Sequence, residues 1–89
     1  ELGQDFLARV FTPQELAACA GSVERLAARW AAKEAVIKAL GWELRDVALT
    51  DIEVTGEGRP RVVLHTTGAV LDVSLSHDGE YAIAVVVAV

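Results

Sequence analysis

Apolar residues recur at helical spacing through the first forty positions of the chain and at strand spacing after position 50. Within residues 1–10, the side chains of Leu2, Phe6, Leu7 and Val10 fall on one side of a helix. A period near 3.6 residues predicts an amphipathic helix in this segment.

Capping residues predict a second helix directly after the first. Thr12 suits the N-cap, Pro13 the first helical position, and Glu15 completes a capping box. This helix should run to about Ala20 and end at Gly21, because glycine commonly follows a helix C-terminus.

A single long helix is predicted from Ser22 to Gly41. Ser22 is a suitable N-cap, strong helix formers fill the interior, and Gly41 can take the left-handed conformation after the last turn. At about 100° per residue, one stripe of this helix should be buried. With Val23 at its edge, that stripe contains Leu26, Trp30, Ile37 and Leu40.

The second half of the chain alternates in the manner of strands. Residues 42–50 lack periodicity and predict a loop in which Trp42 closes the core. The predicted strands are Asp51–Thr55, Arg61–Thr66, Leu71–His77 and Tyr81–Val89. Glycine-containing turns at residues 56–60 and 78–79 separate them. Since Tyr81–Val89 is apolar on both faces, it is predicted to be a central strand covered on both sides. The order predicts an α+β fold, with helices packed on one face of a mainly antiparallel sheet.

The composition of the chain excludes several classes of protein. The chain has 89 residues, 53% hydrophobic residues and a net charge of −5. These values predict one globular domain over residues 1–89 and argue against a general nucleic-acid binder. A single cysteine, Cys19, excludes an intrachain disulfide and fits a cytoplasmic protein. The apolar C-terminal run is too short to cross a membrane as a helix.

Three charges in the long helix need an explanation. Lys33 falls inside the apolar stripe, and Glu34 flanks the stripe one turn before Lys38. In a structural interpretation, Lys33 reaches water past the helix edge while Glu34 and Lys38 form an i,i+4 ion pair. In a functional interpretation, one carboxylate and two ammonium groups face a cleft. Such a set suits a divalent cation and a phosphate chain.

Three motifs, in order, resemble those of the short bacterial 4′-phosphopantetheinyl transferases, the holo-[acyl-carrier-protein] synthases. Trp30-Ala-Ala-Lys33-Glu34-Ala-Val-Ile-Lys38-Ala-Leu-Gly41 is similar to the W/F-(A/S)-x-K-E-A-x-x-K-A-L-G signature of that family. The segment from Phe11 to Glu15 resembles its F-(T/S)-x-x-E segment. Ser74-Leu-Ser76-His77 resembles its S-(L/I)-S-H element.

The resemblance implies an enzyme that moves 4′-phosphopantetheine from coenzyme A to a serine of apo acyl carrier protein. This step serves fatty-acid and lipid synthesis or polyketide synthesis, and the sequence leaves the pathway open. The resemblance also implies Mg²⁺, a homotrimer with active sites between subunits, and an acidic carrier protein as partner. Arg9 and Arg25 are candidates for docking that carrier. By motif position, Glu34 matches the magnesium ligand, Lys38 the lysine at the transferred phosphate, and Lys33 a possible phosphate contact. The same comparison gives a coenzyme-binding set of Lys33, Gly41, Pro60, Ser76 and His77.

Two alternatives to an enzyme stay open. Members of the family begin with a G-(I/V)-G-(I/V)-D strand whose aspartate is a second magnesium ligand, and no such strand precedes the first helix here. We expect that this strand has been omitted from the sequence. A chain without it could instead be a non-catalytic module that binds coenzyme A or a carrier protein. A purely structural α+β domain of an oligomer is the third possibility. His77 alone, beside Asp78-Gly79, would be an ordinary turn residue.

Overall fold

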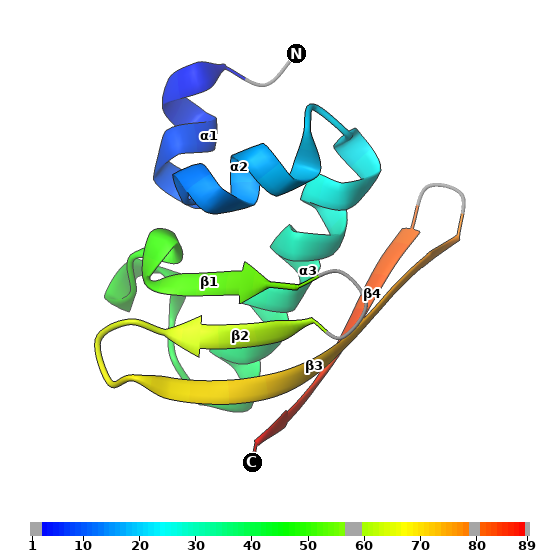
Figure 1. Cartoon of the computed structure of the whole chain (residues 1–89). Helices are drawn as coiled ribbons and strands as arrows, with labels where there is room; N and C mark the ends of the chain where they lie inside the picture. Colours follow the sequence, from blue (N-terminus) through cyan, green and yellow to red (C-terminus); the bar gives the residue numbers. More distant parts are fainter. Residues whose placement is uncertain (1–2, 57–59, 79–80, 89) are drawn as a thin grey trace.

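Three helices precede a four-stranded antiparallel sheet in the computed structural model, which describes the backbone of residues 3–56, 60–78 and 81–88 and the side chains up to residue 72 (Figure 1). Two 3₁₀ turns, η1 and η2, connect the helices to the sheet. The elements are α1 (Gln4–Val10), α2 (Pro13–Cys19), α3 (Val23–Ala39), η1 (Leu44–Asp46), η2 (Leu49–Asp51), β1 (Ile52–Thr55), β2 (Arg61–Leu64), β3 (Ala69–Asp78) and β4 (Tyr81–Ala88). The predicted α+β class is confirmed.

The sheet is a meander in which each strand pairs with the next one along the chain. Its order is β1-β2-β3-β4, and every pairing is antiparallel. Ile52 lies opposite Leu64, and Val62 lies opposite Leu71. The prediction of a central position for residues 81–89 was wrong, because β4 lies at one edge among the described strands. The apolar composition of a strand does not fix its place in a sheet, whereas a meander leaves its last strand with one neighbour.

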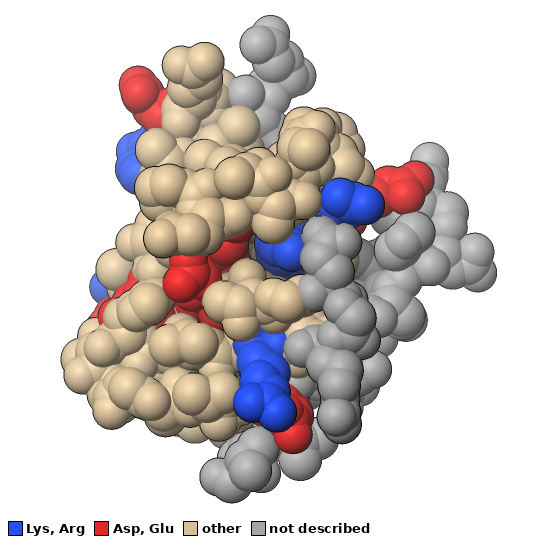
Figure 2. Space-filling model, in the orientation of Figure 1, with Lys and Arg blue, Asp and Glu red and all other residues tan. Residues whose placement is uncertain are grey.

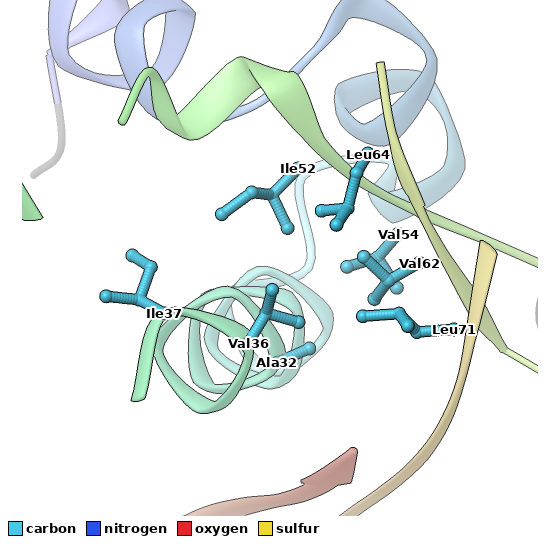
Figure 3. Close-up of a cluster of buried hydrophobic side chains, with 8 residues drawn as sticks. All are labelled: Ala32, Val36, Ile37, Ile52, Val54, Val62, Leu64 and Leu71. Atoms are coloured by element: carbon cyan, nitrogen blue, oxygen red, sulfur yellow. The ribbon is translucent and has the colours of Figure 1, made fainter. Parts of the chain in front are cut away.

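The helix α3 covers one face of the sheet, packing against β1, β3 and β4. Together with this face it encloses the main core (Figure 3). From α3, Ala32, Val36 and Ile37 point toward the strands. The strands contribute Ile52, Val54, Val62, Leu64 and Leu71. A second cluster lies between the helices and contains Val10, Phe11, Cys19 and Leu26. Cys19 is a free cysteine and is buried in this cluster.

The buried face of α3 is rotated from the predicted stripe. Leu26 and Ile37 are buried as expected, whereas Leu40 is 41% exposed and Val23 is 72% exposed. Several residues outside the predicted apolar stripe are buried instead. The buried residues of α3 are Leu26, Ala28, Arg29, Ala32, Lys33, Val36 and Ile37. Small alanines on this face allow the helix to approach the sheet closely.

The helix ends follow the predicted capping residues. The Thr12 hydroxyl accepts a bond from the Glu15 amide (3.1 Å), and the Glu15 carboxylate accepts one from the Thr12 amide (2.9 Å). Ser22 caps α3 by accepting from the Arg25 amide at 3.2 Å. These bonds satisfy amides that have no partner inside their own helix.

The C-terminus of α3 is closed by a Schellman motif. Gly41 has φ +70° and donates its amide to the Lys38 carbonyl at 3.2 Å, while the Trp42 amide donates to the Ile37 carbonyl at 2.9 Å. Trp42 itself packs against the main core, as predicted. Within the described residues, no helix combines the length and the apolar character needed to cross a membrane.

Candidate functional site

Two charged side chains of α3, those of Glu34 and Lys38, lie on the surface one helical turn apart. Both residues are exposed. Among the described residues, neither side chain makes a hydrogen bond or an ion pair, so the i,i+4 pair of the structural interpretation is not formed. With no polar partner in the described part of the chain, this carboxylate and this ammonium group are both available to a ligand.

Lys33 directly precedes Glu34 in the sequence but is buried, whereas Glu34 and Lys38 are exposed. The Lys33 side chain is completely buried, and the ammonium group donates to three oxygens. These are Glu15 Oε1 at 2.7 Å, the Val10 carbonyl at 2.6 Å and the Leu49 carbonyl at 2.8 Å. An ammonium group has three donors, so its capacity is used up inside the fold. Both earlier expectations for Lys33, a reach to solvent and a phosphate contact, are therefore corrected.

The partner of Lys33 is a residue that sequence reasoning interpreted only as a cap. Glu15 is 1% exposed, and its second oxygen, Oε2, accepts from the Val54 amide at 2.9 Å. Glu15 thus joins α2 to both α3 and β1. The signal was present in the sequence, because a lysine at a buried position needs an anion. The sequence alone does not show that Glu15 and Lys33, which are 18 positions apart, lie next to each other in the fold.

The network extends from Glu15 toward the surface. The Thr12 hydroxyl donates to Glu53 Oε2, and Glu53 Oε1 is 3.0 Å from His65 Nε2. His65 belongs to none of the three motifs that carry the family resemblance. Its side chain is 51% exposed, so the network begins in the interior at Lys33 and ends in contact with water. Figure 2 shows acidic side chains reaching the surface in the seam between the helices and the strands, with basic ones beside them.

Burial shifts the acid–base behaviour of Lys33. Desolvation by burial is the largest effect and lowers the pKa of the Lys33 ammonium below its usual 10.5. The hydrogen bond and the charge of Glu15 oppose this effect, as does the charge of Glu53, whereas Arg29 adds to the lowering.

The other predicted site residues lie in three places. Gly41 follows the C-terminus of α3, three residues after Lys38, and is exposed. Pro60 is half-buried and directly precedes β2. Ser76 and His77 belong to β3, a strand that packs against α3, and their side chains lie outside the described residues.

A magnesium ion fits Glu34 only as a shared ligand. Magnesium usually keeps several waters and is held by one or two carboxylates together with substrate phosphates. Glu34 offers one carboxylate that has no polar partner among residues whose side chains are described. Among the described side chains, no three His, Cys, Asp or Glu residues gather into a metal-binding group. These residues therefore suit an ion held jointly by the protein and a phosphate-bearing ligand.

An apolar groove opens beside the N-terminal half of α3. Its volume is about 210 Å³. At its mouth Phe6 is 40% exposed, and the rings of Phe6 and Trp30 lie 6.4 Å apart, centre to centre. The groove is lined by Phe6, Phe11, Val23, Leu26, Ala27 and Trp30. A surface of this kind is typical of a place where another molecule binds.

Comparison with known proteins gives one consistent family. The profile of the "4'-phosphopantetheinyl transferase superfamily" matches residues 1–86. The chain is 50% identical to a holo-[acyl-carrier-protein] synthase of Moorella thermoacetica, over 89% of this chain and 73% of that protein. It is 45% identical to a synthase of the same description from Dehalococcoides mccartyi, over 97% of this chain and 81% of that protein.

A solved structure agrees with these sequence matches. The crystal structure of Helicobacter pylori holo-[acyl-carrier-protein] synthase in complex with coenzyme A superimposes with a TM-score of 0.84. The two proteins are 31% identical, and the match covers 96% of this chain and 82% of the other. Three ordered motifs, the α+β fold and these matches lead to one conclusion: the chain belongs to the holo-[acyl-carrier-protein] synthase family of the 4′-phosphopantetheinyl transferase superfamily.

Proposed function

We propose that this protein transfers 4′-phosphopantetheine from coenzyme A to a serine of an apo acyl carrier protein. The products are the holo carrier protein and adenosine 3′,5′-bisphosphate. The observation that carries the proposal is the pair Glu34 and Lys38 on a helix that is capped at both ends. Both side chains are exposed, and neither has a polar partner among the described residues. The family of the chain supplies the reaction class.

The transfer makes clear electrostatic demands. The serine oxygen forms a bond to the phosphorus that bears the pantetheine arm, and the bond from that phosphorus to the bridging oxygen breaks. The serine proton must leave, and negative charge moves onto the departing bisphosphate. Positioned charges that face this developing charge are the largest source of catalysis in such reactions.

Each proposed residue answers one of these demands. Glu34 would hold Mg²⁺, which neutralises pyrophosphate charge when bound. Lys38 would bind the transferred phosphate and stabilise its charge as a point cation. The proposed coenzyme contacts are Gly41, Pro60, Ser76 and His77. Lys33 is left out of this set because its ammonium group is enclosed.

The carrier protein would dock beside the apolar groove. Acyl carrier proteins are acidic, so a basic group next to apolar surface suits them. Arg9 is exposed in α1, on the same helix as the groove residue Phe6. Its Nε donates to the Asp5 carbonyl, which leaves the other guanidinium donors available. Arg25 donates to the Ala18 carbonyl and has a further interaction within the protein, so Arg9 is the better candidate.

The test is the intact mass of an apo acyl carrier protein after incubation with this protein, coenzyme A and Mg²⁺. We expect a mass gain of one phosphopantetheine, lost with EDTA and reduced at least about a hundredfold in rate by Glu34→Gln or Lys38→Ala. Glu43→Gln is the matched control, because Glu43 is also an exposed glutamate but lies outside α3. Equal rates for the Glu34 and Glu43 variants would refute the assigned role of Glu34.

A non-catalytic binding module is the second candidate. It is favoured by one observation, namely that no three His, Cys, Asp or Glu side chains among the described residues gather into a metal-binding group. Calorimetry with coenzyme A separates the two candidates. Binding without any mass gain on the carrier protein would favour the module, whereas binding with transfer excludes it.

A further inference from the structure

Lys33 and Glu34 are adjacent in sequence, yet one is enclosed and the other faces solvent. On an α-helix successive residues lie about 100° apart, so a fixed direction for Lys33 also fixes the direction of Glu34. Lys38 stands one turn further along the same surface. The contacts of Lys33 therefore bear on the site that Glu34 and Lys38 form.

The three acceptors of Lys33 come from three different parts of the fold. The Val10 carbonyl belongs to the last residue of α1, Glu15 to the first turn of α2, and the Leu49 carbonyl to η2. Each bond has its own direction, so together they restrict both the rotation of α3 about its axis and its shift along that axis. Apolar contacts with the sheet restrict rotation less, because they are not directional.

Stability alone does not explain this arrangement. A buried ion pair often contributes no more than apolar side chains of the same volume, since desolvation offsets the attraction between the charges. What an ion pair with a full set of hydrogen bonds adds is a defined geometry. Glu15 is itself held from two sides, because its oxygens also accept from the Thr12 and Val54 amides.

We propose that Lys33 and Glu15 are positioning residues that set the rotation of α3 and so aim Glu34 and Lys38 at the bound coenzyme. This inference rests on the proposed function. A rotation of about 20° moves a side-chain tip by about 2 Å, given the 5–6 Å radius of a helix with its side chains. A misplacement of about 1 Å can reduce a rate about a hundredfold. A modest rotation is therefore enough to impair transfer while the protein stays folded.

The test compares Lys33→Met/Glu15→Gln with Val36→Ala. The double variant removes both charges together, so no unpaired charge is left buried. Val36→Ala is the matched control, because Val36 is also completely buried in α3 but takes no part in the polar network. Rates are measured at a temperature where circular dichroism shows each variant fully folded.

We expect the double variant to lose at least about tenfold in kcat/KM and to need a higher Mg²⁺ concentration for half-maximal rate. Val36→Ala should stay within about twofold of the wild type, and Lys33→Arg, which keeps the charge, should recover part of the loss. Equal rates for the double variant and Val36→Ala, both folded, would overturn the proposal.

Rotation is measured separately, by residual dipolar couplings of the α3 amides relative to those of β1 and β2. A changed orientation of α3 in the double variant is expected, and unchanged couplings refute positioning. This second readout does not depend on transfer. A wild-type protein that fails to modify a carrier protein therefore counts against the proposed function, while the couplings still decide the role of Lys33 and Glu15.

Discussion

Two lysines in one helix, five residues apart, have different surroundings. Lys38 is exposed, whereas Lys33 is enclosed and its ammonium group donates to three oxygens. The family motif contains both lysines and therefore does not distinguish them. Burial and hydrogen bonding do distinguish them, and they support the proposed positioning role of Lys33.

The titration of Lys33 should differ from that of a free lysine. The chain contains only two lysines, so nitrogen-labelled lysine gives two side-chain signals, with exposed Lys38 as the internal comparison. We expect the Lys33 signal to titrate below 10.5, because desolvation lowers its pKa. A midpoint at or above 10.5 would contradict the enclosed environment.

The same shift determines a contribution to stability. Between the lowered pKa of the folded state and 10.5, the unfolded chain binds more protons at this residue than the folded one. The contribution of Lys33 to the free energy of unfolding therefore rises with pH across that window and levels off above 10.5. Urea unfolding of wild type and Lys33→Met/Glu15→Gln over this range should show the extra rise in the wild type alone.

At the scale of the element, the start of α2 combines two functions. Its capping box closes the helix, and the same two residues connect α2 to the strand β1. Thr12 donates its hydroxyl to Glu53, while Glu15 accepts from Val54. A capping box usually concerns one helix alone. Here it also fixes the distance between the helical layer and the sheet.

Thr12→Ala should therefore lower the free energy of unfolding by more than the loss of an ordinary helix N-cap does. Loss of the cap costs about 1 kcal/mol, and the buried Glu53 carboxylate loses a donor, which adds about 1–3 kcal/mol. Thr12→Ser keeps the hydroxyl and should change the free energy of unfolding much less. Urea unfolding of the two variants measures both effects. A cost for Thr12→Ala of only about 1 kcal/mol would mean that the bond to Glu53 contributes nothing.

Most helix boundaries could be predicted from the sequence, because the residues that end a helix lie within one turn of its end. Ser22 and Gly41 bracket α3 as predicted, and Thr12 begins α2. The buried face of α3 was predicted only in part. Burial at Leu26 followed from the apolar pattern, whereas exposure of Leu40 and enclosure of Lys33 depend on which elements pack against the helix.

At the scale of the whole molecule, the strand β4 is the element most suited to contact another chain. It lies at one edge of the described sheet, paired on one side with β3. A strand edge with unpaired amides and carbonyls is commonly covered by another chain. A chain of 89 residues also builds only a modest core, so association would stabilise it. Both observations favour the homotrimer that the motif resemblance implies.

Light scattering after size exclusion should give three times the 9.5 kDa mass of the chain. On dilution, the melting temperature should fall as the trimer dissociates, because assembly stabilises the folded state by mass action. A mass of 9.5 kDa at every concentration, from a sample that still transfers phosphopantetheine, would refute the trimer.

Family and chemistry could be recognised from the sequence alone. The three ordered motifs identified the transferase family, and the profile match and the relatives confirm it. Glu34 and Lys38 could be singled out because their spacing on a helix follows from the sequence directly. The roles of these residues, and of Gly41, Pro60, Ser76 and His77, stay predictions.

The sequence by itself determined what depends on neighbours along the chain: helix starts and ends, strand periods, and the motif spacing that marks the family. Only the tertiary structure decided what depends on distant neighbours. It paired Lys33 with Glu15, 18 positions away, joined Thr12 to Glu53, 41 positions away, and placed β4 at an edge. The physical reason is that capping and periodicity are local properties of the backbone. The partner of a buried charge, by contrast, is set by how whole elements pack.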